Sequence, residues 1–268
     1  MSDPAGKQKM RLAIGVFDGV HRGHQKVIAK AHLALVITPH PDPSTQLLTT
    51  AAEKKDLIGN IAEFAFSPRR ARLSPEAFLK LIWKKYKPET IIVGHDFHFG
   101  CQRSGNVATL KKLGCRYKLN IEEIPEYYYR RERVRSSIIR DYLRAGQIRR
   151  ANSLLGRDYQ LYGAIVRGKQ LGRKLGYPTL NIRIDEPRKL IPADGVYSGE
   201  VIVQNKIYRA GIFIGNNLIE AHLLNFAGQI YGQKAVLFPQ DYLRPPQKFQ
   251  TLAALRRQIK KDIQKIKR

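Results

Sequence analysis

The chain has 268 residues, of which 43% are hydrophobic and 26% are charged, and its formal net charge is +26. This length allows two ordinary domains, and this composition is typical of a globular soluble protein. No apolar run approaches the roughly 20 residues that span a bilayer, which argues against a membrane protein. Residues 1–11 lack the apolar segment of a secretory signal.

Cysteine usage and charge bear on location and partners. Cys101 and Cys115 form no disulfide framework and no metal-binding pattern, so a reducing cytoplasm is expected. The positive charge attracts anions such as nucleotides and nucleic acids. Because charge runs usually lie on solvated faces, a solvated surface is the main interpretation, and accessory nucleic-acid contact is the alternative. The sequence does not define an oligomeric state.

Up to about residue 156, short apolar strands alternate with helical stretches. Strands are predicted at residues 12–16, 35–38 and 90–93, and helices at residues 22–33, 75–86, 137–145 and 147–155. Pro75 stands at the start of its helix, where proline is favoured, and Gly146 separates the last two helices. Strands that alternate with helices predict an α/β fold with a doubly wound, Rossmann-like parallel sheet.

From Tyr159 onward the segments are short, rich in β-forming residues and separated by glycine, asparagine or proline. Strands are predicted at residues 161–166, 195–203, 207–214, 218–224 and 229–238. Closely spaced strands of this kind predict an antiparallel β-barrel. The domain boundary is expected near Gly156, which gives an N-terminal domain of residues 1–156 and a C-terminal domain of residues 157–268.

A C-terminal helix is predicted at residues 251–267. One stripe along it is apolar and consists of Leu252, Leu255, Ile259, Ile263 and Ile266. Such a stripe predicts packing on the barrel, with the basic face in water. A helix that lies on a membrane surface is the alternative, and the absence of Trp and Phe from the stripe argues against it.

The segment Gly15-Val-Phe-Asp-Gly-Val-His-Arg-Gly-His24 follows a predicted strand and opens a helix. Its glycines let the backbone turn sharply and approach a phosphate closely. The helix start adds N–H groups and a positive dipole, and His21 and His24 are spaced so that both can face one ligand. These features predict a site for the negative charge that develops on an α-phosphate during nucleotidyl transfer.

Metal binding is the alternative for two histidine pairs, His21 with His24 and His95 with His98. Neither pair has a nearby third ligand of suitable type, whereas zinc sites in proteins usually have three or four protein ligands. Phosphate binding is therefore the favoured interpretation of the first pair.

A second segment combines three glycines at spacings of four with a Pro-Thr-x-Asn stretch: Gly168, Gly172, Gly176, Pro178, Thr179 and Asn181. The glycines permit a flap with exposed N–H groups, and Arg173 and Lys174 add positive charge. The hydroxyl of Thr179 and the carbonyl of Asn181 are hard oxygen ligands that suit Mg²⁺ beside ATP phosphates. By composition alone, a glycine-rich loop with no ligand is an equal alternative.

The N-terminal motif resembles the HxGH nucleotidyltransferases, and more specifically the N-terminal module of bacterial bifunctional riboflavin kinase/FAD synthetases. The resemblance continues through Thr38-Pro-His-Pro41, Val93-Gly-His-Asp-Phe-His-Phe-Gly100 and Arg135-Ser-Ser-Ile-Ile-Arg140. It implies that three catalytic residues stabilise the transferring phosphates: His21, His24 and Arg140. It implies further ATP-binding residues at Gly15, Phe17, Asp18, Gly19, Gly23, Ser136 and Ser137, and flavin-binding residues at Asp96 and Phe97.

The C-terminal glycines resemble the riboflavin kinase signature of the same family, GxxxGxxxGxPTxN. Other landmarks are Asp194-Gly-Val-Tyr197, Glu220-Ala-His-Leu-Leu-Asn-Phe226 and Tyr231-Gly232. The resemblance implies that Glu220 is the catalytic base, since the riboflavin 5′-hydroxyl is neutral and must lose a proton as it attacks the γ-phosphate. An exposed strand carboxylate is the alternative for Glu220. The resemblance also implies Mg²⁺ on Thr179 and Asn181, and ATP or flavin contacts from Gly168, Gly172, Arg173, Gly176 and Pro178.

The chain departs from the family pattern in both halves. Arg135 stands where the family has its first Ser, and Ser137 where it has Thr. His95 and His98 occupy positions usually taken by Glu and Arg. The loop before the catalytic strand is almost absent, which leaves a tight turn expected at residues 216–217.

These observations predict a cytoplasmic enzyme that uses ATP and Mg²⁺ in two steps. The C-terminal domain would convert riboflavin to FMN, and the N-terminal domain would convert FMN to FAD with release of pyrophosphate. Two alternatives stay open. One is a single-activity enzyme with one decayed module, which the shortened loops motivate. The other is a non-enzymatic flavin- or nucleic-acid-binding protein, which the charge of +26 motivates. No membrane partner is expected.

Overall fold

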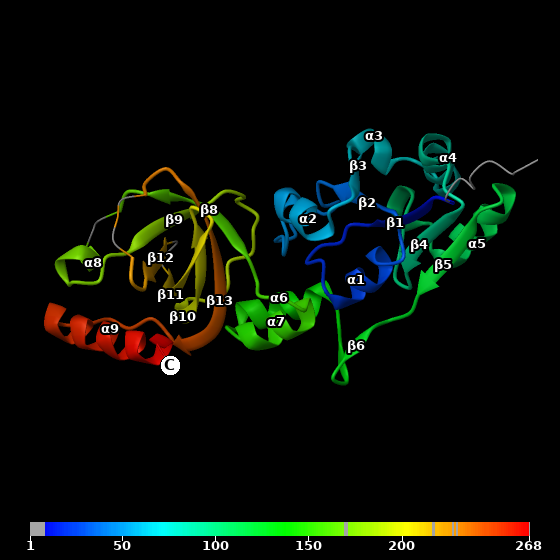
Figure 1. Ribbon diagram of the computed structural model, residues 1–268. Coiled ribbons are helices and arrows are strands. Elements are labelled where there is room, and N and C mark those ends of the chain that lie inside the picture. The colour runs from blue at the N-terminus through cyan, green and yellow to red at the C-terminus, as the bar shows by residue number, and fades with distance from the viewer. Residues whose placement is uncertain (1–8, 169–170, 216–217, 227, 229, 268) are drawn as a thin grey trace, which may run out of the picture. The chain divides into compact units, whose positions relative to one another are not determined.

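The computed structural model describes residues 9–168, 171–215, 218–226, 228 and 230–267. The chain divides into two compact units, Met1–Arg135 and Ser136–Arg268 (Figure 1). We call them the N-terminal unit and the C-terminal unit. Among the described residues, no helix is both long enough and apolar enough to cross a membrane.

The N-terminal unit is built on a five-stranded sheet with the order β3-β2-β1-β4-β5. Its strands are β1 (Arg11–Gly15), β2 (Leu33–Thr38), β3 (Ile61–Ala65), β4 (Thr90–Gly94) and β5 (Asn120–Ile124). Every pair of neighbours is parallel. The predicted doubly wound α/β fold is therefore confirmed. The strand order reverses between β1 and β4, and in such sheets ligands bind outside the carboxyl ends of the strands at this point.

Helices connect these strands, as parallel pairing requires. They are α1 (Arg22–Ile28), α2 (Ala51–Ile58), α3 (Pro68–Ala71), α4 (Pro75–Tyr86) and α5 (Val107–Arg116), with a short 3₁₀ turn, η1 (Cys101–Arg103). A small hairpin follows, formed by β6 (Tyr128–Tyr129) and β7 (Glu132–Arg133). The side chain of Ser74 caps α4 and Pro75 begins it, so the predicted bounds of this helix are confirmed.

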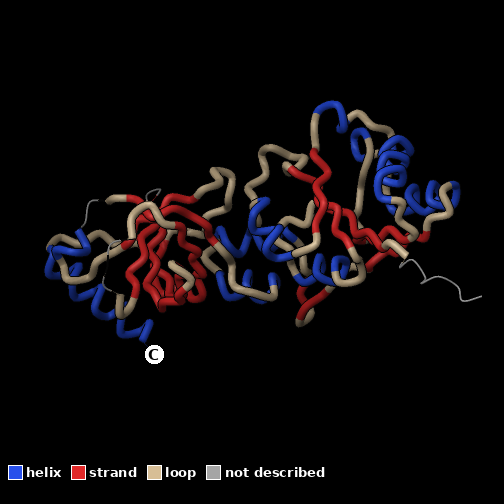
Figure 2. The backbone as a smooth tube through the Cα atoms, turned by 45° about the horizontal axis from the view of Figure 1, so that its top comes forward, coloured by secondary structure: helices blue, strands red, loops and turns tan. Residues whose placement is uncertain are grey.

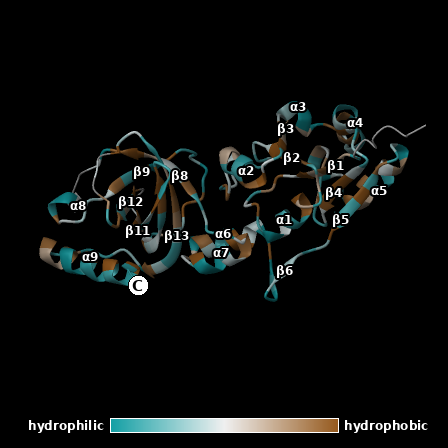
Figure 3. Cartoon of the chain, in the orientation of Figure 1, coloured by the Kyte–Doolittle hydropathy of each residue, from teal (hydrophilic) through white to brown (hydrophobic). Residues whose placement is uncertain are grey.

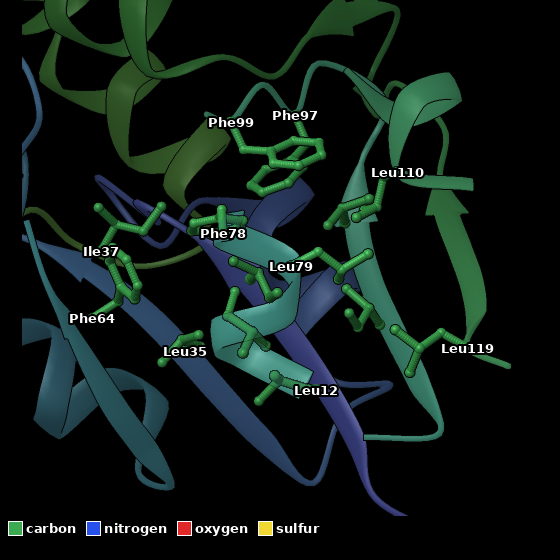
Figure 4. Packing of buried hydrophobic residues seen from close by; sticks show 14 of the residues in the cluster. Leu12, Leu35, Ile37, Phe64, Phe78, Leu79, Phe97, Phe99, Leu110 and Leu119 are labelled. Carbon is green, nitrogen blue, oxygen red and sulfur yellow. The ribbon is translucent and has the colours of Figure 1, made fainter. Parts of the chain in front are cut away.

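The side chains of alternate residues of β1 pack on opposite faces of the sheet. Leu12 and Ile14 pack in the cluster that also contains Phe78 and Leu79 of α4 (Figure 4). Ala13 packs on the other face with Val27 of α1. A strand covered on both faces must be apolar throughout, and β1 therefore gives a continuous apolar run.

The predicted helix at residues 22–33 is too long. The structure ends α1 at Ile28, and Leu33 opens β2. Leu33 pairs with Leu12 of β1 in the parallel ladder. A position in the sheet interior thus overrides the helical spacing of the local sequence, because the ladder satisfies backbone groups that burial would otherwise leave unpaired.

Helix α2 was not predicted, although its signal is present in the sequence. Thr50 and Glu53 form a capping box, in which each side chain accepts a hydrogen bond from the other residue's backbone N–H. This is the Thr-x-x-Glu pattern typical of a helix start. The other elements of this unit that were not predicted are β3, α3, η1, α5, β5, β6 and β7.

The C-terminal unit begins with two helices, α6 (Ser136–Arg144) and α7 (Ile148–Leu155), and continues into a closed barrel (strands are red in Figure 2). The barrel order is β10-β11-β12-β9-β8-β13, and all its pairs are antiparallel. The strands are β8 (Leu161–Val166), β9 (Leu180–Ile184), β10 (Gly195–Val203), β11 (Lys206–Gly215), β12 (Leu218–Leu223) and β13 (Lys234–Arg244). The predicted barrel is confirmed. The prediction missed β9 and the short helix α8 (Leu171–Lys174).

The last barrel strand was predicted to end at Phe238, before Pro239. Instead β13 runs to Arg244. The register of β13 against β10 shifts between Ser198 and Gly199, where Pro239 pairs. A bulge of this kind accommodates a proline, because the ladder there does not require its missing N–H. The expected first residue, 229, lies outside the described residues, as does the turn at 216–217.

The C-terminal helix α9 (Leu252–Lys267) contacts the barrel strand β11. Ile266 of the predicted stripe is buried, and Leu252 at the other end is 59% exposed. Leu255, Ile259 and Ile263 are half-buried, so the stripe is covered except at Leu252. Figure 3 shows hydrophilic residues along much of this helix.

The division into units falls at Arg135, earlier in the chain than the predicted boundary at Gly156. Helix α7 packs on β13, and this contact assigns both helices to the C-terminal unit. Gly156 ends α7 in a left-handed conformation. Whether residues 136–156 serve the N-terminal activity, as a boundary at 156 implies, stays a prediction.

Candidate active sites

The loop that leaves β1 has an unusual backbone, and we call residues Gly15–His24 the phosphate loop. Phe17, Gly19 and Val20 all have positive φ, at 50°, 91° and 40°. Such values are rare for residues other than glycine and are strained for a β-branched valine. A side chain at Gly15 would stand 2.9 Å from the ring of Phe17. Strain of this kind persists only where neighbouring structure holds the backbone in place.

His21 and His24 lie together at the start of α1. Their rings stack with centroids 3.6 Å apart, and the edge of Phe17 packs on His24 at 5.5 Å. The backbone N–H of His24 donates to Nδ1 of His21 at 3.3 Å. A neutral His21 therefore carries its proton on Nε2, where it can donate to an anion. The structure brings the two predicted catalytic histidines into one site.

Asp18 holds the loop. Its carboxylate is 3% exposed and accepts hydrogen bonds from the backbone N–H groups of Leu48 and Thr49, both at 3.0 Å. These contacts supply hydrogen-bond donors to a buried carboxylate. The ATP contact predicted for Asp18 stays a prediction.

The predicted flavin-binding residues follow β4, the other strand at the switch point. Asp96 is exposed. Phe97 is 9% exposed and stacks on Phe99, with ring centroids 5.5 Å apart, in the hydrophobic core (Figure 4). Most of its ring is thus committed to packing. The nearby His95, at a position where the chain departs from the family, lies 3.5 Å from the carboxylate of Glu126.

Ser136, Ser137 and Arg140 lie on the first turns of α6, in the C-terminal unit. Ser137 is exposed, and the other two are half-buried. Their predicted place beside the phosphates of ATP stays a prediction.

In the C-terminal unit, three positions of the flap require glycine, each for a structural reason of its own. A side chain at Gly168 would collide with the amide of Asn181 at 2.2 Å, and one at Gly172 would collide with the carbonyl oxygen of Tyr177 at 2.4 Å. Gly176 has open space around it but a φ of 83°. Two glycines are needed for close approach and the third for a left-handed turn. Arg173 lies exposed on α8 between them.

Glu220 faces the Pro-Thr-x-Asn segment across a strand pair. It is directly opposite Asn181 in the register of β12 and β9. The hydroxyl of Thr179 donates to its Oε2 at 3.5 Å. Burial raises the pKa of Glu220, and the Thr179 hydrogen bond lowers it in part. The structure therefore gathers three predicted residues of the kinase site, and it makes Glu220 a better proton acceptor than an exposed carboxylate.

The oxygen atoms here fit a magnesium ion. Asn181 is 7% exposed, and its side chain, a Thr hydroxyl and a carboxylate supply hard oxygen donors of the kind that Mg²⁺ prefers. In the described part of the chain, no group of three or more His, Cys, Asp or Glu side chains is arranged to hold a metal.

Three further residues contact the candidate sites and were not assigned a role in the sequence analysis. Nδ1 of His222 lies 2.8 Å from the carbonyl oxygen of Pro178, and its ring packs on Tyr177. Thr49 and Lys54 contact the phosphate loop. His222 could have been found from the sequence, because it lies two residues after Glu220 and so shares its face of the strand. The contacts of Thr49 and Lys54 join segments about 30 or more residues apart, and no local sequence pattern indicates them.

The fold and the geometry together define an α/β and β-barrel protein with two candidate sites, one at the switch point of the parallel sheet and one on the barrel. A family model described as FAD synthetase matches residues 3–138, and one described as riboflavin kinase matches residues 155–268. The chain belongs to the bifunctional riboflavin kinase/FMN adenylyltransferase family.

Similar proteins support this assignment along the whole chain. The bifunctional riboflavin kinase/FMN adenylyltransferase of Buchnera aphidicola subsp. Schizaphis graminum is 33% identical and aligns over 96% of this chain and 93% of its own length. The Escherichia coli K12 protein with the same description is 30% identical, over 94% and 90%. A crystal structure from Streptococcus pneumoniae, described as a macrolide-efflux protein, superposes with a TM-score of 0.86 at 26% identity, covering 97% of this chain and 94% of that one.

Proposed function

We propose that the two activities of this family, riboflavin kinase and FMN adenylyltransferase, are divided between the β-barrel and the α/β part of this chain, with Ser136, Ser137 and Arg140 of α6 assigned to the adenylyl step. The barrel phosphorylates riboflavin to FMN, and the α/β domain with its phosphate loop transfers AMP to FMN, forming FAD. The arrangement of Glu220 against Thr179 and Asn181 is the observation that carries this proposal. A protein that only binds flavin needs no half-buried base beside a set of oxygen ligands.

The kinase step follows from the position of Glu220. Its carboxylate takes the proton of the riboflavin 5′-hydroxyl while that oxygen attacks the γ-phosphorus of ATP. The bond from the γ-phosphorus to the bridging oxygen breaks, and ADP leaves. Thr179 and Asn181 would hold Mg²⁺, which neutralises phosphate charge when bound. Gly168, Gly172, Gly176 and Pro178 would let the backbone approach the nucleotide, and Arg173 would add positive charge there.

The adenylyl step needs no base, because the attacking FMN phosphate is already an anion. Its oxygen attacks the α-phosphorus of ATP, and pyrophosphate leaves. His21 and His24 stabilise the charge that develops on the α-phosphate. Ser136, Ser137 and Arg140 would hold the β- and γ-phosphates, with Arg140 as a fork of donors. The glycines of the phosphate loop allow close approach, while Asp96 and Phe97 serve the flavin side.

We also propose a cytoplasmic location, and the free thiols of Cys101 and Cys115 support it. The two alternatives, a single-activity enzyme and a flavin- or nucleic-acid-binding protein, are distinguished from the main proposal by the experiment below.

Two variants separate the steps when the whole chain is incubated with riboflavin, ATP and Mg²⁺ and the flavins are separated over time. We expect His24→Ala to reduce FAD formation by about 100-fold or more while FMN accumulates, since one stabilising donor is lost from the transition state. We expect Glu220→Gln to reduce FMN formation by about 100- to 10,000-fold and to leave conversion of supplied FMN to FAD intact.

Each variant is the control for the other, because both units are present in both. Loss of both activities together in each folded variant would show that the activities are not divided in this way. Loss of a single step in the unmodified chain would favour the single-activity alternative. Salt-sensitive nucleic-acid binding without flavin turnover would favour a binding protein.

A further inference from the structure

The phosphate loop rests on a second segment, Leu48–Lys54, which we call the support segment. It spans the residues before α2 and the first turn of that helix. The family motifs discussed above do not include it. Its contacts reach the loop between Val16 and Gly19, the stretch that contains the left-handed residue Phe17.

Thr49 is the centre of the first set of contacts. Its hydroxyl oxygen accepts the backbone N–H of Gly19 at 2.9 Å and donates to Oδ1 of Asp18 at 3.3 Å. The same carboxylate accepts the backbone N–H groups of Leu48 and Thr49. Thr49 is 2% exposed, so water does not replace these bonds at low cost. This network fixes the peptide plane between Asp18 and Gly19.

Lys54 makes the second contact. It is 4% exposed, and its Nζ donates to the carbonyl oxygen of Val16 at 2.8 Å. This bond fixes the peptide plane immediately before Phe17. Lysine is rarely buried to this extent, because desolvation of an ammonium group is costly. The contact also brings positive charge beneath a loop that is expected to bind phosphates.

These contacts stabilise a backbone conformation that is unfavourable by itself. Phe17, Gly19 and Val20 all have positive φ, and a turn bond from Val20 N–H to the Phe17 carbonyl at 3.1 Å closes this stretch. His21 follows directly, so a change in the turn would displace the stacked histidines. Displacement by about 1 Å can cost about 100-fold in rate.

We propose that Thr49 and Lys54 are positioning residues for AMP transfer, acting through the phosphate loop on His21 and His24. This inference rests on the proposed adenylyl function. The residues do not contact substrate; they keep the catalytic histidines in place. Their loss should therefore lower kcat for FAD formation more than it changes KM.

The first test is Thr49→Val in the whole chain, which keeps the shape of the side chain and removes the hydroxyl. We expect kcat for conversion of FMN to FAD to fall about 10- to 100-fold, with KM for ATP changed less than about threefold and riboflavin phosphorylation unchanged. Thr49→Ser restores the hydroxyl and should recover most of the rate. Thr109→Val is the control, because it removes a hydroxyl at a half-buried position of α5 that donates to Asn106 and not to the phosphate loop.

The second test is Lys54→Met, which keeps an unbranched side chain and removes the ammonium group. The expected loss is again confined to kcat for FAD formation. Lys55→Met is the matched control, because Lys55 is exposed and next to it on α2. Fluorescence of Trp83, the sole tryptophan of the chain and part of the N-terminal unit, reports whether this unit is still folded.

The outcomes separate the inference from the function. If the unmodified chain makes no FAD from FMN and ATP, the proposed adenylyl function fails. If it does, but folded Thr49→Val and Lys54→Met variants keep full kcat, the positioning role is wrong. A loss in Thr49→Val that Thr49→Ser does not recover also overturns the role of the hydroxyl. If Thr49→Val unfolds, the folded Thr49→Ser and Lys54→Met variants decide the matter.

Discussion

Glu220 shows at the scale of one residue how the barrel prepares a side chain for proton transfer. The residue is half-buried on β12, and its neighbour across the strand pair is the amide Asn181 rather than a cation. Burial favours the protonated carboxyl and raises its pKa. The Thr179 hydroxyl opposes this effect only in part. The outcome is a base suited to a neutral hydroxyl substrate.

This shift predicts the pH dependence of the kinase step. Glu220 accepts a proton only when ionised, and its pKa in the folded chain is raised above the ordinary value of 4.5. We therefore expect kcat for FMN formation to fall as the pH drops through a value above 4.5. The measurement is kcat for both steps between pH 4.5 and 8. An acid limb that persists in Glu220→Gln would assign the titration to another group.

Asp18 illustrates a different use of a carboxylate. Its position in the motif suggests a contact with ATP, and its observed partners are the backbone N–H groups of Leu48 and Thr49. A carboxylate with several backbone donors needs no substrate to satisfy it. Residues of one motif can thus divide between chemistry and support of the loop.

At the scale of elements, α9 is held to the barrel by one buried ion pair. The guanidinium of Arg244, at the end of β13, binds Asp262 through Nε at 3.0 Å and a terminal nitrogen at 2.8 Å. The side chains are 14% and 7% exposed. Ile266 packs beside this pair, against β11, where a side chain at Gly211 would stand 2.9 Å from it. The helix is therefore anchored at its C-terminal half, while Leu252 lies in solvent.

Asp262→Asn tests this anchor. Removing one partner of a buried ion pair leaves the other charge uncompensated, which costs about 3–5 kcal/mol of unfolding free energy. We expect a loss of this order for the C-terminal unit in urea unfolding followed by circular dichroism. The Trp83 fluorescence transition, which reports on the N-terminal unit, should not move. Lys261→Ala on the exposed face of α9 should change stability by less than about 0.5 kcal/mol. An equal effect of the two substitutions would show that the pair does not anchor the helix.

At the scale of the whole molecule, helix α7 is built into the C-terminal unit. Its buried residues are Ile148, Ala151, Leu154 and Leu155. The amide of Asn152 donates to Asp158 at 3.0 Å and to the carbonyl of Pro239 in β13 at 3.3 Å, and it accepts the N–H of Tyr159. These contacts join the helix to both the first segment and the last strand of the barrel.

We therefore predict that a fragment of residues 136–268 is more stable than one of residues 157–268. The shorter fragment exposes the barrel surface that α7 covers and leaves the Pro239 carbonyl without its donor. The comparison is made by measuring the melting temperature and the rate of riboflavin phosphorylation of each fragment. Equal melting temperatures and equal rates would place the boundary at residue 156, as the sequence alone suggested.

Much of this protein could be predicted from local sequence. Short motifs can be recognised without the fold, because all their residues lie in one segment. They include the glycines and histidines of the phosphate loop, the flap glycines and the Pro-Thr-x-Asn stretch. The parallel sheet and the barrel followed from the spacing of apolar residues. Pro75 located the start of α4, since proline is favoured in the first turn of a helix.

The tertiary structure decided what depends on residues far apart in the chain. The partners of Asp18 and Gly19 come from about 30 residues away, and that of Val16 from 38. The end of α1 was set by pairing of Leu33 with β1, and the extension of β13 past Pro239 by a bulge against β10. Sequence patterns show which secondary structure a segment favours on its own. Backbone hydrogen bonds, burial and pKa values depend on which distant segment lies opposite, and only the folded chain supplies that neighbour.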